Sequence, residues 1–163
     1  MRNDLTWPEP DETVLAEYVN KVGKQIGFIF PSDYVECAIH YNGSAVLPYN
    51  FEVDGVSRVL GTLLSYDKDS SENIIKVYQK YSSSLPKELV PFAFDPAGNL
   101  ICFDYKGHED NPIVVFWEHE NAWEKEMLIR EEGLTEETAE ERARENVFYV
   151  AESFTAFLDM LHD

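Results

Sequence analysis

Three consecutive apolar runs decide the fold: Val90-Pro91-Phe92-Ala93-Phe94, Leu100-Ile101-Cys102-Phe103-Asp104-Tyr105 and Ile113-Val114-Val115-Phe116-Trp117. The two later runs are apolar at nearly every position instead of at every second one. Strands with this pattern are usually covered on both faces. The three runs therefore predict a sheet at the centre of the molecule with helices packed against it.

The turns between the runs predict how the strands pair. Residues 95–99 form a short connection in which Gly98 supplies a positive φ, so the first two runs are expected to form an antiparallel hairpin. Two weaker strands are expected at residues 45–51 and 58–64, with a turn at residues 53–56 between them.

Helical spacing predicts the other elements. A first helix is expected at residues 11–22, with Gly23 ending it. A second helix is expected to begin at Pro31 and to stop at Asn42-Gly43. A third helix is expected at residues 72–82. The C-terminal helix is expected to carry a continuous apolar stripe made of Val147, Val150, Ala151, Phe154, Phe157, Leu158 and Leu161. The predicted fold class is α+β: a single domain over residues 1–163, with a central, mainly antiparallel sheet packed by two N-terminal helices and a C-terminal helix.

Size and cysteine content point to a chain that needs neither metal nor disulfide for stability. A chain of 163 residues buries roughly 70% of its unfolded surface. Cys37 and Cys102 both lie inside apolar patterns, which favours reduced core thiols and a cytoplasmic location. No signal peptide or membrane-spanning segment is expected.

The charge restricts the class of partner. Thirty-one acidic residues against thirteen basic ones give a formal charge of −18. Nucleic acids and anionic membranes are disfavoured as partners because no basic stripe exists to meet them. A basic protein partner is favoured by complementary charge, although acidity that serves only solubility is an equal alternative.

An abrupt change from apolar to acidic residues ends the third run and marks a candidate partner-binding surface. Acidic residues of the adjoining strand and loop are expected to cluster with this strand end, and the alternative is a solvated strand end. The candidate residues are Asp104, Glu109, Asp110, Glu118, His119 and Glu120.

Catalytic and metal-binding readings are weaker. A metal site that uses His108, His119 and these carboxylates matches no known ligand spacing. In a chain with 31 acids, no carboxylate pair stands out as a glycosidase pair, and no nucleophile elbow or phosphate loop is present. We therefore expect a non-enzyme without metal or cofactor. An enzyme acting through surface carboxylates is the alternative, and it would need a concave pocket.

A strongly acidic stretch, at about residues 121–146, precedes the C-terminal stripe. Residues 135–146 present only Ala139 and Ala143 on the apolar face, so this part is expected to project into solvent. Glu140 precedes Arg144 by four residues, an order that supports a helix. A solvated helix face is the favoured interpretation, and an arm that faces a partner is the alternative.

Five motifs in order resemble the SUKH superfamily, the group of the Smi/Knr-type regulators of fungal cell-wall assembly and their bacterial relatives. The motifs are Phe30-Pro31-Ser32-Asp33-Tyr34 with Tyr41-Asn42-Gly43; Phe92-Ala93 with Asp95 and Gly98-Asn99; Cys102-Phe103-Asp104-Tyr105; Phe116-Trp117-Glu118-His119-Glu120; and Val150-Ala151-Glu152-Ser153-Phe154 leading to Phe157-Leu158. The resemblance spans about residues 12–161. The acidic stretch at 121–146, often shorter in the family, departs from it as a helical insertion.

The resemblance implies a binding module with no established catalytic residues. For bacterial members it implies an immunity protein that neutralises a toxin, often a nuclease, encoded beside it. A basic polymorphic toxin domain is thus the expected partner, and a regulatory scaffold in cell-wall or signalling assembly is the alternative. The sequence does not indicate an oligomeric state.

Overall fold

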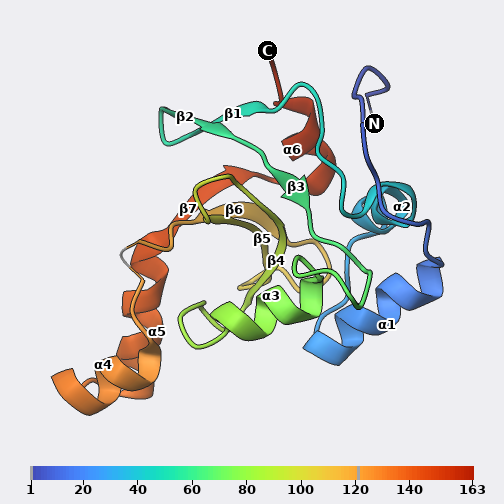
Figure 1. Cartoon of the computed structure of the whole chain (residues 1–163). Coiled ribbons are helices and arrows are strands. Elements are labelled where there is room, and N and C mark those ends of the chain that lie inside the picture. Colours follow the sequence, from blue (N-terminus) through green and yellow to red (C-terminus); the bar gives the residue numbers. More distant parts are fainter. Residues whose placement is uncertain (1, 121) are drawn as a thin grey trace.

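A five-stranded antiparallel sheet forms the centre of the molecule, as the sequence predicts. The computed structural model describes residues 2–120 and 122–163 (Figure 1). The strand order is β3-β4-β5-β6-β7, and every neighbouring pair is antiparallel. The strands are β3 (Thr62–Leu63), β4 (Leu89–Phe94), β5 (Leu100–Asp104), β6 (Ile113–Trp117) and β7 (Val147–Ala151). Gly98 has a φ of +89° in the β4–β5 turn, which confirms the predicted hairpin.

Both faces of this sheet are buried, which explains the uninterrupted apolar runs. In β5, Ile101 and Phe103 belong to one apolar cluster, while Leu100 and Cys102 belong to a second cluster. Each of these four residues is at most 1% exposed. Alternate side chains of one strand thus supply two cores.

Helices and a separate hairpin cover the sheet. Figure 1 shows α6 and the β1–β2 hairpin above the sheet and α3 below it. The elements are α1 (Ala16–Ile26), α2 (Ser32–Tyr41), β1 (Asn50–Val53), β2 (Val56–Val59), α3 (Ile74–Tyr81), α4 (Lys125–Glu132), α5 (Glu136–Ala143), the 3-10 turn η1 (Arg144–Asn146) and α6 (Phe154–Asp159). None of the helices in the described residues is long and apolar enough to cross a bilayer.

The motif Phe30–Tyr34 serves the fold. Asp33 Oδ1 accepts a hydrogen bond from the backbone N–H of Tyr34 at 2.8 Å, at the start of α2. Its Oδ2 accepts from the backbone N–H and the hydroxyl of Thr155, at 3.0 and 2.8 Å, at the start of α6. One carboxylate therefore satisfies donors at two helix N-termini. Tyr34 packs edge-on against Phe103 at 5.2 Å between ring centroids, inside the larger core.

Asn42, which follows α2, also has a structural role. Its amide donates to the carbonyls of Glu12 and Ala38, both at 3.2 Å, and accepts from the backbone N–H of Tyr66 at 2.9 Å. The residue is 1% exposed. It therefore satisfies backbone groups of three segments: the residues before α1, helix α2 itself and the loop after β3.

The prediction of one continuous C-terminal helix is wrong for the first part of the segment. Residues 147–151 form the edge strand β7, which pairs with β6, and the helix begins only at Phe154. This segment is Val-Phe-Tyr-Val-Ala, and β-branched and aromatic residues favour a strand. Ser153 separates the two elements, since its hydroxyl accepts from the N–H of Ala156 as the cap of α6. The apolar stripe of this region therefore belongs to two elements.

Three further boundaries differ from the predictions. Helix α1 starts at residue 16, because the N–H groups of Asp11 and Val14 bind carbonyls at the end of α2, and it continues past Gly23 to Ile26. Asn73, with a side chain that accepts from two backbone N–H groups, is the cap of α3. The predicted strand 58–64 is divided at Gly61, where an added Cβ would lie 2.6 Å from the Phe94 carbonyl oxygen.

Candidate partner interface

The acidic stretch folds into a helical hairpin. Helix α4 ends at Gly133, whose φ of +70° places it in the left-handed region that favours glycine. The hydroxyl of Thr135 accepts from the N–H of Thr138 and caps α5. Figure 1 shows α4 and α5, in orange, extending away from the other helices. Residues 122–146 contain nine glutamates and four basic residues, a net charge of −5.

Glu140 fastens this hairpin to the rest of the molecule. One carboxylate oxygen accepts from Lys125 Nζ at 2.7 Å, and the other accepts from the backbone N–H of Lys87 at 3.1 Å. Beside it, Ala139 and Ala143 are buried. Residues 135–146 therefore form a helix as predicted, but they pack against the molecule along one side.

Arg144 makes the second connection. Its Nη1 and Nη2 donate to the two oxygens of Asp104 at 2.7 and 3.0 Å, and Nη2 also donates to Glu88 at 3.1 Å. Burial alone would lower the pKa of Arg144, but the hydrogen bonds that it donates to both carboxylates outweigh burial and raise that pKa. The ion pair expected between Glu140 and Arg144 does not form, because each residue pairs outside α5.

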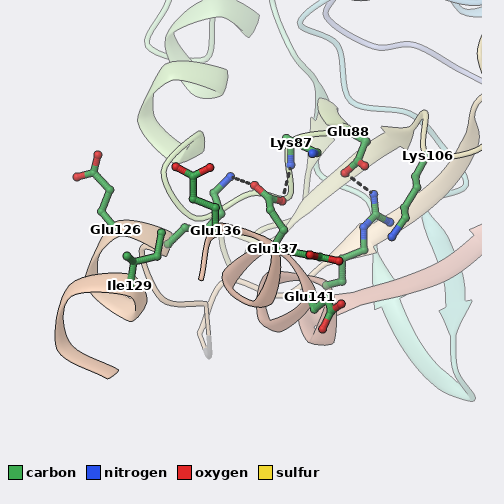
Figure 2. Close-up of a pocket in the computed structure, with 11 residues that line it drawn as sticks. Lys87, Glu88, Lys106, Glu126, Ile129, Glu136, Glu137 and Glu141 are labelled. Carbon is green, nitrogen blue, oxygen red and sulfur yellow. Dashed lines mark hydrogen bonds and ion pairs between the residues drawn. The ribbon is translucent and has the colours of Figure 1, made fainter. Parts of the chain in front are cut away.

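A cavity of about 560 Å³ lies between the hairpin and the end of the sheet. Figure 2 shows its lining: Lys87 and Glu88 lie before β4, Lys106 follows β5, and the other labelled side chains belong to α4 and α5. The lining residues are Lys87, Glu88, Lys106, Lys125, Glu126, Ile129, Glu136, Glu137, Glu140, Glu141 and Arg144.

Four of the lining glutamates are free to meet a partner. In the part of the chain that the structure describes, no ion pair or hydrogen bond engages the carboxylates of Glu126, Glu136, Glu137 and Glu141. All four residues are exposed. They form an acidic surface held in place by the Glu140 and Arg144 contacts, and we call it the acidic surface below.

The six residues predicted to form one rim are divided between opposite ends of the sheet. In the β5–β6 register, Asp104 lies opposite Ile113, while Leu100 lies opposite Trp117. Four steps along the strand at roughly 3.4 Å each separate the two ends by about 14 Å. Glu109 and Asp110 are exposed on the β5–β6 loop at the Asp104 end, whereas residues 118–120 lie at the other end.

Two of these six residues have structural partners. Asp104 is 5% exposed and paired with Arg144, so its carboxylate is not presented to solvent. The backbone N–H and Nδ1 of His119 lie 3.1 and 3.0 Å from Asn99 Oδ1. Since that oxygen accepts, Nδ1 is assigned as a donor here. Asn99 is in turn bound to Asp95, so His119 fastens the β4–β5 turn to the end of β6.

Metal-binding side chains do not assemble. Among residues 2–120 and 122–163, no three histidine, cysteine or carboxylate side chains gather in a way that could hold a metal ion. Both cysteines are buried and reduced.

The residues of the acidic surface are not among the six partner-binding residues predicted from the sequence. Their only indication in the sequence was the density of glutamates between positions 131 and 145, which a solvated helix face explains equally well. The exposed Trp123, next to α4, was also missed. Both depend on tertiary contacts that fix the orientation of the hairpin.

Comparison with known proteins supports the resemblance inferred from the motifs. A search among curated proteins found no match to the chain. A family model described as the SMI1 / KNR4 family (SUKH-1) matches residues 13–160, nearly the whole chain. The match includes the core motifs around Asp33 and Asn42 and also the acidic hairpin. The chain therefore belongs to the SMI1 / KNR4 family (SUKH-1).

Proposed function

We propose that this protein binds and neutralises a basic protein toxin of the nuclease type. The family is known for immunity proteins and is generally a binding family without catalysis. The observation that carries the proposal is the acidic surface, four exposed and unpaired glutamates beside a cavity. A nuclease must approach phosphates and is therefore expected to be basic, so an acidic inhibitor can occupy the same charges.

The way in which the hairpin is attached favours recognition over simple solubility. Acidic residues that serve only solubility need no fixed positions. Here Glu140 and Arg144 fasten α5 to residues 87, 88 and 104, and Glu140 also binds Lys125 of α4, so the backbone positions of the free glutamates are fixed before a partner arrives. A preorganised surface loses less side-chain freedom on binding. Opposite charges also raise the association rate above the neutral range of about 10⁵–10⁶ M⁻¹s⁻¹.

The test is neutralisation of the toxin domain encoded beside this gene. The purified chain should co-purify with that domain and suppress its activity. Absence of binding and of protection would refute the proposal. If the protein is instead a regulatory scaffold, no toxin gene should lie beside its gene, and the protein should give no protection against a toxin.

A matched pair of variants locates the surface. Glu126, Glu136, Glu137 and Glu141 changed together to glutamine should slow toxin association and weaken its dependence on salt. The control changes four exposed glutamates in the first 36 residues to glutamine, at Glu9, Glu12, Glu17 and Glu36. Both variants lose four negative charges, so equal effects would mean that only net charge matters.

The four rim carboxylates without a structural partner, of which Glu118 is half-buried and the others are exposed, remain separate candidates. We propose testing Glu109 with Asp110, and Glu118 with Glu120, as two alanine pairs because they lie at opposite ends of the sheet. A loss of affinity in one pair alone would assign that end to the interface, and unchanged affinity and salt dependence in both would remove the rim.

A further inference from the structure

A second groove lies on α4, on the face opposite the acidic surface. Met127 and Glu131 lie four residues apart on one side of α4, and Trp123 lies four residues before Met127, just ahead of the helix. With Leu128, Glu132 and Arg142 they line a groove of about 310 Å³. Glu126 and Ile129 of the same helix line the other cavity instead.

The exposure of Trp123 is larger than its structural role explains. Trp123 precedes the cap residue Glu124, and Leu128 is the fourth residue of the helix, so the two occupy the positions of a hydrophobic staple. A staple accounts for the buried Leu128. It does not account for Trp123, which remains 59% exposed. The other two tryptophans are less exposed, since Trp117 is 1% exposed and Trp7 is half-buried and stacked on Tyr41.

The groove joins this apolar surface to negative charge. Arg142 lies 3.5 Å from Glu132 and 3.2 Å from Glu145, so its charge is already matched. Among the described residues, Glu131 has no ion-pair partner, and neither does the carboxylate of Glu124 beside Trp123. The groove thus combines apolar side chains with the free carboxylate of Glu131 in its lining, and the free Glu124 is the chain neighbour of Trp123.

We propose that this groove binds a lysine- or arginine-rich segment of the protein partner that presents an apolar side chain to Trp123. The apolar side chain would fill the space between Trp123, Met127 and Leu128. Flanking cations would pair with Glu131 and Glu124, and one of them can also stack on the indole face. Exposed aromatic residues of this kind dominate binding energy at interfaces.

Charge decides between this occupant and others. A second copy of the chain would bring another −18 to an already acidic surface, and an anionic bilayer is repelled in the same way. A cationic, amphipathic protein segment satisfies both parts of the groove. This inference rests on the proposed function, because it names the surface that would engage the basic partner.

The first test uses a defined probe, a helical peptide of lysine and leucine about 18 residues long, or about five turns. Binding to the full chain should blue-shift tryptophan emission, because Trp123 is the most exposed of the three tryptophans, and this shift should be absent in Trp123→Ala. Trp123→Ala should weaken binding about tenfold or more. Leu15→Ala is the control, since Leu15 is 74% exposed and lies at the start of α1. A peptide with serine in place of leucine should bind more weakly.

Each outcome of this test decides the inference. Equal affinity of the wild type and Trp123→Ala for the leucine peptide would overturn it, as would an equal loss in Leu15→Ala. Concentration-dependent dimers that Trp123→Ala abolishes would assign the groove to a second copy and also overturn it. The melt of Leu15→Ala should match the wild type because Leu15 is exposed, whereas Trp123→Ala removes the staple residue opposite Leu128 and should lower the melting temperature slightly while leaving the variant folded.

Repeating the titration with the neighbouring toxin domain separates the two proposals. Binding to the wild type with an unchanged affinity in Trp123→Ala would refute the groove and keep the immunity function. Peptide binding that requires Trp123, together with no toxin binding, would refute the immunity function and keep the groove. If Trp123→Ala loses toxin binding while the wild type and Leu15→Ala keep it, both the groove and the immunity function are supported.

Discussion

Removal of the Arg144 guanidinium should destabilise the protein by separating the acidic hairpin from the sheet. Arg144→Met keeps much of the apolar stem and deletes the donors to Asp104 and Glu88. Asp104 is then left 5% exposed, and its remaining hydrogen bond comes from the backbone N–H of Lys106 at 3.0 Å. The desolvation cost of a buried carboxylate that loses its cation is offset only in part by this one hydrogen bond.

The magnitude follows from how deeply the group is buried. Breaking a fully buried ion pair costs about 3–5 kcal/mol, and an exposed pair is worth less than about 1 kcal/mol. The side chains of Arg144 and Glu88 are 20% and 26% exposed, and that of Asp104 is 7% exposed. We therefore expect a loss of about 2–3 kcal/mol in the free energy of unfolding. For a domain of this size, that corresponds to a decrease in Tm of about 5–10 °C.

The assay is urea unfolding of the two single variants and of the double variant Asp104→Asn with Arg144→Met. The cycle should give a coupling energy of about 2 kcal/mol between the two residues. Arg142→Met is the matched control, because the ion-pair partners of Arg142 within the described residues are the exposed Glu132 and Glu145, and the change in stability should be less than about 0.5 kcal/mol. If Arg144→Met is no more destabilising than Arg142→Met, the hairpin is not anchored through this contact.

Three further predictions concern groups outside the hairpin. Asn42→Ala should cost about 2 kcal/mol in urea unfolding, since buried backbone groups lose the partners that the amide supplies. Burial raises the pKa of Cys37 to about 12 and that of Cys102 well above its usual value, so a thiol reagent at about pH 8 should modify both only after unfolding. Hydrogen bonds to the C-terminal backbone and to Glu52 raise the pKa of His162, so its contribution to stability is complete below about pH 6.5 and is lost as the pH rises through the folded value. An NMR titration should show this elevated pKa, Glu52→Gln should lower it, and an unshifted His162 would contradict the contact.

The sheet was predictable because its signals are local. A run that is apolar at every position has few options other than a strand covered on both faces, and Gly98 marked the hairpin turn. The edge strand β7 was not predictable in the same way. Its Val147, Val150 and Ala151 fit the helical period together with the residues of α6, so the spacing alone favours one long helix. Pairing with β6, a long-range contact, decides for the strand.

The candidate site shows the limit of reasoning from neighbours in sequence. Residues 104–110 and 118–120 are close along the chain, yet an antiparallel hairpin places the beginning of β5 beside the end of β6 and sends Asp104 to the opposite end. The partner of Asp104 is Arg144, forty residues away, in a segment whose own spacing suggested a pair with Glu140. Glutamates of the hairpin are therefore divided by their contacts into paired residues, such as Glu140, and residues left free. Only the free group, Glu126, Glu131, Glu136, Glu137 and Glu141 among them, can exchange water for a basic partner without first breaking the fold. This division separates the stability effect expected at Arg144 from the binding effects expected on the two faces of the hairpin.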